Sequence, residues 1–587
     1  MLGDRTSQDV TGIVRGCFGA APMPYLTDAS MRQRAIETAR GQGLLERLAS
    51  DSADGEPIRV LPYTRLRDYQ RDGNRTRFEA LQRERTARID RVAMACALGI
   101  DRLDELHDLL WAECETTWWG MPAHERHGTP IDLRVALLGR RYATILTLLA
   151  ETIAPEVRER MLDEINRRIL RPYLDPAAHH HWKFTTNNWN AVCIANVAIT
   201  AMLIETESAR LARLIVDALE HLPNFLAGFT ADGGCTEGPS YWRFGFGWYI
   251  HLAAALYDYT GGRIDIARGE TIGAICRYPL SVSLGPGKEL TFADAHAGWQ
   301  DPVVVTLINR FHDVPELFGL CAARADGTPE LASIEALLLY DGWTASPPAE
   351  TGDHWLKDLG ICRVRAGATV VGAKAGHNAE HHNHNDVGSF LVFRDGQTYL
   401  TDPGAPIYSA RTFSDRRYES LFCNSWGHSV PVIAGHLQPP GRDYAGRLEV
   451  AGLAGHAAKT LRIALADAYD VDSLERLDRV IELARDGMEV RLADTVAFSG
   501  AGEAIEEAFI TAHAAEVSED ARAVTIRPQG ASSAVLSADG QGRFAVEELT
   551  EASRREARGG EILRRITFTP PAAAREQTLR FVLRFGS

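Results

Sequence analysis

The stretch Ile361-Cys362-Arg363-Val364-Arg365, followed after a short turn by Ala368-Thr369-Val370-Val371, marks a change in the character of the sequence. Apolar residues alternate with others in the first run, as they do in strands that bury one face. Later runs of the same kind, separated by Asp-Gly and other Gly-containing turns, occupy residues 461–465, 479–483, 488–492, 562–566 and 579–583. From here onward the pattern predicts antiparallel sheets packed as a sandwich.

The sequence before this stretch has helical spacing instead. Apolar residues recur at intervals of three and four, with short Pro or Gly breaks, through residues 88–111, 133–153, 157–170, 190–205, 209–225 and 248–259. No strand alternation is expected among them. Serial helix pairs without a fixed repeat length favour a closed toroid over an open solenoid. A linker at Ser346-Pro347-Pro348-Ala349-Glu350 divides a helical domain, residues 1–345, from a β domain, residues 346–587.

The composition excludes several classes of protein. The chain has 587 residues, of which 24% are charged and 45% hydrophobic, as in an ordinary globular protein. A net charge of -15 argues against nucleic-acid binding. The longest apolar stretch, residues 191–204, is too short for a membrane span. We expect no membrane partner and a cytoplasmic protein with reduced thiols, because the nine cysteines form no CxxC pair and no signal segment is evident. A periplasmic location and a homodimer are left open.

Side chains that can bind metals or transfer protons are most concentrated between Gly376 and Gly435. His382 and His384 differ by two positions, so on an extended strand they would share a face, and Asp402 follows the next apolar run. With His428 these residues suggest a metal site made of His384, Asp402 and His428, and a catalytic His382 beside it. The alternative is a polar loop with solvated histidines.

Two segments of the helical part carry functional residue types. The first, Asn187-Asn188-Trp189, offers amide and stacking contacts that suit sugars, although an asparagine here could simply be a helix N-cap. The second, Asp232 to Gly245, contains a Gly-rich loop that leads into Tyr241 and Arg243. A tyrosine in this position is either a catalyst or a packed residue with a bonded hydroxyl, and the spacing does not separate these readings.

Taken together, the segments 187–189, 232–241, 382–386, 402–404 and 424–428 resemble, in order, motifs of the heparinase II/III-like superfamily of polysaccharide lyases. The resemblance implies an incomplete α/α toroid followed by an antiparallel β-sandwich, with the active site in a cleft between them. It also implies cleavage of uronic-acid polysaccharides by β-elimination. That reaction removes the proton on carbon 5 of a uronate and expels the glycosidic oxygen from carbon 4.

The resemblance assigns roles to the catalytic candidates. Asn187, with Asn188 beside it, would neutralise the charge that develops on the uronate carboxyl group. Tyr241 would act as base and acid in turn, provided that its site lowers its pKa from the ordinary value of about 10. His382 would contact the carboxylate or act as base from the other face. Several relatives have a histidine where this chain has Asn188, which makes activity on both carbon-5 epimers doubtful.

The resemblance also assigns metal and substrate contacts. His384, Asp402 and His428 match metal ligands, with Zn²⁺ as the expected ion and Mn²⁺ as the alternative. The metal would hold the loop that carries His382. The expected substrate-binding residues are Trp189, Glu237, Arg243, Arg416 and Tyr418. Arg417 is a further candidate, and surface ion pairing is the alternative for all three arginines.

The leading hypothesis is therefore a lyase for anionic, uronate-containing oligosaccharides or polysaccharides of the glycosaminoglycan or alginate type. A metal-dependent glycoside hydrolase is the second hypothesis, since Glu237 could pair with Asp232 or Asp386 as two acid/base carboxylates. A carbohydrate-binding protein that has lost its catalytic activity is the third. The polymer, the epimer and the choice between endo and exo action stay open.

Overall fold

The computed structural model describes residues 5–50, 57–345, 352–455 and 458–586, and the chain forms two compact units. The first consists of Met1–Gly228, Trp242–Gly273 and Gln300–Ser346, and the second of Phe229–Tyr241, Ala274–Trp299 and Pro347–Ser587. The second unit thus includes two segments from the part of the sequence that was expected to be a separate helical domain. The predicted linker at residues 346–350 lies outside the described residues, and the boundary at 345/346 stays a prediction.

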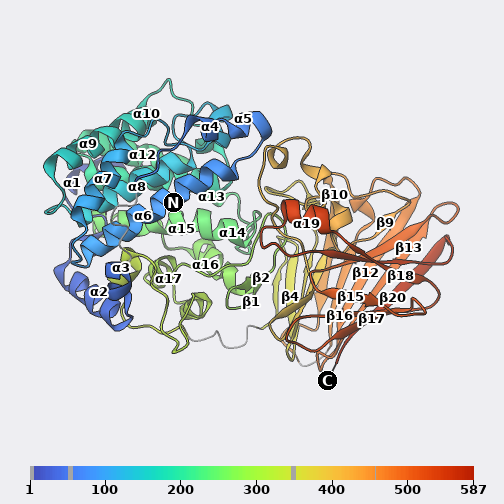
Figure 1. Ribbon diagram of the computed structural model, residues 1–587. Helices are drawn as coiled ribbons and strands as arrows, with labels where there is room; N and C mark the ends of the chain where they lie inside the picture. The colour runs from blue at the N-terminus through green and yellow to red at the C-terminus, as the bar shows by residue number, and fades with distance from the viewer. Residues whose placement is uncertain (1–4, 51–56, 346–351, 456–457, 587) are drawn as a thin grey trace. The chain divides into compact units, whose positions relative to one another are not determined.

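The first unit is built from helices, as the apolar spacing predicted (Figure 1). Its α-helices are α1 (Ser7–Gly16), α2 (Ala29–Gly41), α3 (Leu44–Ser50), α4 (Tyr63–Leu66), α5 (Asp68–Asp72), α6 (Thr76–Ala97), α7 (Leu103–Cys114), α8 (Leu133–Leu148), α9 (Pro155–Ile165), α10 (Arg171–Leu174), α11 (Asn188–Ile204), α12 (Ser208–His221), α13 (Pro223–Leu226), α15 (Gly247–Thr260), α17 (Pro302–Asn309) and α18 (Ile334–Leu339). Helix α16 (Glu270–Val282) runs from this unit into the second one.

Helix α11 forms the centre of the first unit. Nearly all of its residues are buried, which explains the apolar stretch at 191–204, because a helix that is hydrophobic on every side is surrounded by protein. It packs against α8 and α15. Gly139 of α8 allows close approach to Thr200 of α11, where a side chain at this position would also collide with Ile169. No helix among the described residues combines the length and apolarity needed to cross a membrane.

The second unit is built from antiparallel strands. One sheet has the order β15-β16-β17-β20-β13-β12-β11-β10-β6, a second β18-β19-β14-β9, and a third β3-β4-β5-β7-β8. The strands are β3 (His354–Leu356), β4 (Ile361–Ala366), β5 (Thr369–Lys374), β6 (Gly376–Asn378), β7 (Phe390–Arg394), β8 (Gln397–Leu400), β9 (Val432–Ile433), β10 (Gly441–Ala451), β11 (Lys459–Ala464), β12 (Leu474–Leu483), β13 (Glu489–Phe498), β14 (Ile505–Thr511), β15 (Ala514–Val517), β16 (Ala523–Arg527), β17 (Ala534–Asp539), β18 (Arg543–Glu548), β19 (Arg564–Thr569) and β20 (Glu576–Phe585).

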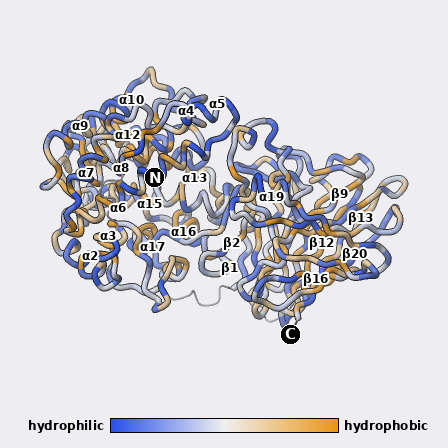
Figure 2. Tube along the Cα trace, in the orientation of Figure 1, coloured by the Kyte–Doolittle hydropathy of each residue, from blue (hydrophilic) through white to orange (hydrophobic). Residues whose placement is uncertain are grey.

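The three sheets bury one continuous apolar core, to which Val392, Ile481 and Phe509 contribute from different sheets. Buried and less buried residues alternate along β12, β13 and β20, and Figure 2 shows hydrophobic and hydrophilic colours mixed in this part of the trace. Alternation of this kind places every second side chain in the core of a sandwich. The predicted fold class, a helical region followed by packed antiparallel sheets, is confirmed.

The prediction that no strand interrupts the first 345 residues is wrong. Strands β1 (Ser283–Gly285) and β2 (Lys288–Glu289) form a short hairpin inside that range, in the segment that belongs to the second unit. Its turn contains Gly285 and Gly287, which both have positive φ angles. The strands were too short to produce an alternating pattern. The segment that follows them, residues 291–299, carries the central residue of the candidate site.

Candidate active site

The candidate active site is organised around Asp294, a carboxylate that is 1% exposed. Its Oδ2 accepts hydrogen bonds from His382 Nδ1 at 2.8 Å and from the Tyr408 hydroxyl at 3.1 Å. Its Oδ1 contacts His384 Nε2 at 3.0 Å and Arg417 Nη2 at 2.8 Å. Burial alone would raise the pKa of Asp294, but His382, His384 and Arg417 hold that pKa well below its usual range. Asp294 is therefore an ionised anchor.

The backbone is strained in both segments that meet at Asp294, the one around Ala293 and the one around His382. Ala293 and His382 both have left-handed φ angles, +61° and +57°, which are uncommon for residues other than glycine. The two strained segments are joined directly, because the Asp294 amide donates to the His382 carbonyl at 3.2 Å. Strain of this kind persists only where surrounding contacts over-determine the conformation, and it clusters at functional sites.

Tyr241 lies beside the anchor. Its hydroxyl forms a short hydrogen bond with the hydroxyl of Tyr408, which in turn contacts Asp294. The ring of Tyr241 stacks on the ring of His382, with centroids 4.0 Å apart and planes 18° apart. Burial and the Asp294 carboxylate raise the pKa of Tyr241, whereas the expectation was that its site would lower it. In the free protein Tyr241 is therefore protonated.

His382 lies in a turn and not on a strand, so the expectation that His382 and His384 share the face of a strand is wrong. The two rings nevertheless converge, because each contacts a different oxygen of Asp294. With Nδ1 directed at Asp294, Nε2 of His382 faces Glu237 Oε2 at 3.4 Å. A carboxylate bound to one ring nitrogen fixes the tautomer and leaves the other nitrogen as the basic one.

The carboxylates considered for a hydrolase each have another partner in the structure. Asp232 holds its own loop, accepting from Gly234 N at 3.3 Å and from Asp358 N at 2.8 Å. Asp386 is buried in an ion pair with Lys374. Glu237 Oε2 lies 3.4 Å from His382 Nε2.

The predicted metal ligands lie together behind His382. His428 Nδ1 contacts Asp402 Oδ2 at 2.9 Å, and the rings of His384 and His428 are 5.3 Å apart. All three residues are buried. Ligand atoms of His384, Asp386 and His428 come within 4.8 Å of one another, and this close group among the described residues contains Asp386 and not the predicted Asp402. Although burial opposes it, Asp402 raises the pKa of His428.

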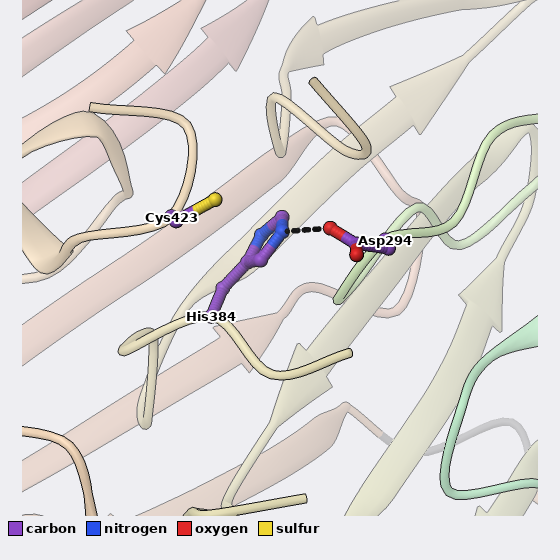
Figure 3. Close-up of side chains that lie close together, drawn as sticks. All are labelled: Asp294, His384 and Cys423. Atoms are coloured by element: carbon purple, nitrogen blue, oxygen red, sulfur yellow. Dashed lines mark hydrogen bonds and ion pairs between the residues drawn. The ribbon is translucent and has the colours of Figure 1, made fainter. Parts of the chain in front are cut away.

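His384 fits a metal ligand in one further respect. Its Nε2 is held by Asp294, and its buried Nδ1 has no hydrogen-bond partner among the described residues. A carboxylate on one nitrogen and a free lone pair on the other is the arrangement that protein metal sites use. Figure 3 shows the ring of His384 between Asp294 and Cys423, whose ligand atoms form a second close group. Burial raises the pKa of the Cys423 thiol to about 12.

The arginines of the second unit differ in what they bind. Arg416 is exposed and pairs with Glu419 at 2.8 Å, which is the surface ion pair that was its alternative reading. Arg417 donates to Asp294 and to the carbonyls of Asn383 and Thr412, so it supports the site. Tyr418 accepts from Asn383 Nδ2 at 3.5 Å. Arg558, which the sequence did not single out, stacks on the ring of Tyr408 at 4.4 Å.

Comparison with known proteins identifies the second unit. Residues 348–581 match the family model described as Heparinase II/III-like, C-terminal. No curated protein matches the sequence. Among solved structures, that of heparinase III has 13% identity and a TM-score of 0.60, covering 97% of this chain and 93% of that chain.

Two further structures extend this likeness. A mutant of the heparan sulfate lyase HepC from Pedobacter heparinus has 12% identity and a TM-score of 0.57, with 97% and 93% coverage. A mutant of the chondroitin AC lyase from Streptomyces coelicolor A3 has 13% identity and a TM-score of 0.53, with 97% and 83% coverage. At such identities the likeness establishes the fold, and it confirms the predicted class of α/α toroid followed by β-sheets.

The other predicted residues lie in the helical unit, outside the unit that contains the matched residues 348–581. Asn187 is the N-cap of α11, since its side chain accepts from Trp189 N at 3.2 Å. Asn188 is buried. The ring of Trp189 packs among the imidazoles of His124, His127 and His181. Arg243 lies in the π-helix Trp242–Phe246. Their roles toward a substrate stay predictions.

Sequence reasoning missed Asp294, Tyr408 and Arg558 of the second unit. Asp294 follows an apolar run inside a region with helical spacing, and its only signal is the Gly285-Pro286-Gly287 turn just before it. Tyr408 lies six residues after Asp402 and could have been proposed together with Tyr418. Arg558 lies 150 residues after Tyr408 and has no sequence signal of its own.

Proposed function

We propose that the protein is a polysaccharide lyase that cleaves uronate-containing glycans of the glycosaminoglycan or alginate type by β-elimination. The observation that carries the proposal is the arrangement of Tyr241, His382 and Tyr408 around the ionised Asp294. This arrangement offers a protonated acid and an oriented imidazole side by side. The solved structures with this fold include lyases named for heparan sulfate and for chondroitin, which supports the class of substrate.

In the proposed reaction His382 is the base. Asp294 holds Nδ1–H, so Nε2 takes the proton from carbon 5 of the uronate, and the imidazolium that forms is stabilised by Asp294. Tyr241 then donates its hydroxyl proton to the glycosidic oxygen that leaves carbon 4. The cycle closes when the His382 imidazolium loses the proton gained from carbon 5 and the hydrogen-bonded Tyr241–Tyr408 pair regains one from solvent. Asn187 keeps its predicted role at the carboxyl group as part of this proposal.

The test is to incubate the protein with hyaluronan, chondroitin sulfate, heparan sulfate, alginate and glucuronan and to follow the ultraviolet absorbance of unsaturated uronates. Growth of this absorbance on any of the five supports a lyase. New reducing ends without it would instead establish hydrolysis. Binding without any product would identify a carbohydrate-binding protein, and both results would overturn the proposal.

Tyr241→Phe is the sharpest variant, because it removes the proposed acid and keeps the ring that stacks on His382. We expect turnover to fall about 10²- to 10⁴-fold with oligosaccharide binding preserved. Tyr399→Phe is the matched control, since the Tyr399 hydroxyl donates to the Ser532 carbonyl at 2.6 Å instead. Full activity in Tyr241→Phe would eliminate this residue as the acid.

We also propose that His384, Asp402 and His428 hold a divalent metal, with Zn²⁺ preferred and Mn²⁺ as the alternative. The free Nδ1 of His384 and the burial of all three residues support this proposal. The ion would supply a fixed charge that holds the loop of His382. His384→Ala should lose the metal in elemental analysis and lower the unfolding temperature, whereas the exposed His436→Ala should do neither. Unchanged metal content in His384→Ala would reject the assignment.

A further inference from the structure

The guanidinium of Arg558 lies next to the hydrogen-bonded tyrosines Tyr241 and Tyr408, and the proposed reaction gives it no role. It comes from the C-terminal part of the chain, just after α19 (Thr550–Glu556), and its side chain is exposed. Its guanidinium lies over the ring of Tyr408 at 4.4 Å, and Nε donates to the Pro406 carbonyl at 2.9 Å. These two contacts fix the plane of the guanidinium, because stacking and one hydrogen bond leave it little freedom to rotate.

The remaining donors of this guanidinium are available. Among the described residues, neither Nη1 nor Nη2 of Arg558 forms a hydrogen bond or an ion pair. Arg416 and Arg417 differ in this respect, because Glu419 and Asp294 already bind them. An oriented guanidinium with two free amino groups is the arrangement that binds a carboxylate or a sulfate through paired hydrogen bonds.

The position of Arg558 indicates which anion it would bind. Tyr408 separates Arg558 from Tyr241, and the hydroxyls of the two tyrosines are hydrogen-bonded. The guanidinium therefore lies one aromatic ring away from the proposed acid. An anion at that place belongs to the sugar next to the cleaved bond and not to the reacting uronate.

We infer that Arg558 is a specificity-determining residue that binds an anionic group on the sugar next to the reacting uronate. The substrates it favours carry an anion on both sugars that flank the bond, as polyuronates and sulfated glycosaminoglycans do. Hyaluronan, whose amino sugar is neutral, lacks the second anion. This inference rests on the proposed function and adds to it the charge pattern of the substrate.

The test measures binding, so that it does not depend on turnover. Tetrasaccharides of glucuronan, of sulfated heparan and of hyaluronan are titrated calorimetrically against the Tyr241→Phe protein with and without Arg558→Gln. Loss of a charge-assisted pair predicts a dissociation constant about 10- to 100-fold higher for the first two ligands and less than about 3-fold higher for hyaluronan. Comparison of the first two shows whether a carboxylate or a sulfate is preferred.

Two further variants control the result. Arg554→Gln removes an exposed cation from the same segment and should leave all three affinities unchanged. Arg558→Lys keeps the charge without the planar donors and should recover part of the affinity. Equal weakening for all three ligands, or no change for any, would overturn the inference. If the parent protein binds none of the tetrasaccharides, the proposed function itself fails, and the inference falls with it.

Discussion

At the scale of single residues, the candidate site is held together by one carboxylate, that of Asp294. Asp294 is buried, which is costly for an ion, and it is kept ionised by contacts with Arg417 and two imidazoles. Each of its oxygens binds two groups, so one carboxylate orients His382, His384 and Tyr408 together. Removing its charge should therefore affect several side chains at once.

Asp294→Asn tests this. The substitution keeps the shape but leaves the cation of Arg417 buried without its counter-charge, so the free energy of unfolding should fall by about 3 kcal/mol. Activity per folded molecule should fall at least about 100-fold, because the tautomer of His382 is no longer fixed. Chemical denaturation and turnover on the preferred substrate are the measurements.

Glu556→Gln is the control for that prediction. Glu556 is also a buried carboxylate of the second unit and pairs with Arg411, but it contacts none of the proposed catalytic residues. Its loss should lower stability and leave turnover per folded molecule within about 3-fold of the parent. Equal activity losses in the two variants would mean that Asp294 acts only through stability.

At the scale of secondary-structure elements, the loop between β6 and β7 is shaped by what it contacts and not by its own sequence. A strand was expected there, yet His382 takes a left-handed turn conformation. The hydrogen bond from Asp294 N to His382 O, together with the two imidazole contacts, stabilises that conformation. Tertiary contacts thus override the local tendency of the segment.

In the helical unit, helix α9 carries a carboxylate, Glu164, that is surrounded by arginines. Glu164 lies near the end of α9, and three arginines bind it: Arg160, Arg167 and Arg168. Burial works against the charge, but these hydrogen bonds lower the pKa of Glu164 to about 2. A depressed carboxyl pKa contributes stability above pH 4.5, and this contribution is lost as the pH falls toward 2.

Glu164→Gln should therefore destabilise the protein by about 1–3 kcal/mol at pH 7 and by progressively less between pH 4.5 and pH 2. Urea unfolding followed at several pH values measures this difference. Glu159→Gln on the same helix is the control, because Glu159 is exposed. A penalty for Glu164→Gln that is independent of pH would show that packing, and not charge, accounts for its effect.

At the scale of the whole molecule, the second unit is discontinuous in sequence. Residues 229–241 and 274–299 belong to it, and they supply Glu237, Tyr241 and Asp294. The C-terminal β region therefore lacks part of its own unit when it is separated from the preceding 345 residues. The heparinase II/III-like match at 348–581 covers the sheets but not these segments.

A fragment of residues 352–587 tests this organisation. Without Asp294 it leaves Arg417 and His384 unsatisfied, so we expect a lower unfolding temperature and earlier exposure of apolar surface than in the full chain. Calorimetry and dye binding measure these properties. Supplying residues 1–345 in trans should restore the transition. A fragment as stable as the full chain would contradict the assignment of the two segments.

Much of the architecture follows from local patterns. Period-two alternation identified β4, β5, β11, β12, β13 and β20, and helical spacing identified the long helices, because burial of one face leaves its period in the sequence. The pattern missed β1 and β2, which are too short to show a period. It also placed His382 on a strand, since a left-handed residue between polar neighbours leaves no periodic signal.

The sequence by itself determined the order of helical and β regions, and it supplied Tyr241, His382 and the set His384, Asp402 and His428 as candidates. These follow from side-chain type and from spacing along one segment. Only the tertiary structure decided that Asp294 joins them, that Tyr408 is hydrogen-bonded to Tyr241, and that Arg558 stacks on Tyr408. The residues that these contacts join are 88, 167 and 150 positions apart in the sequence. Contacts over such distances depend on how the whole chain packs, and the pattern of any one segment does not contain that information.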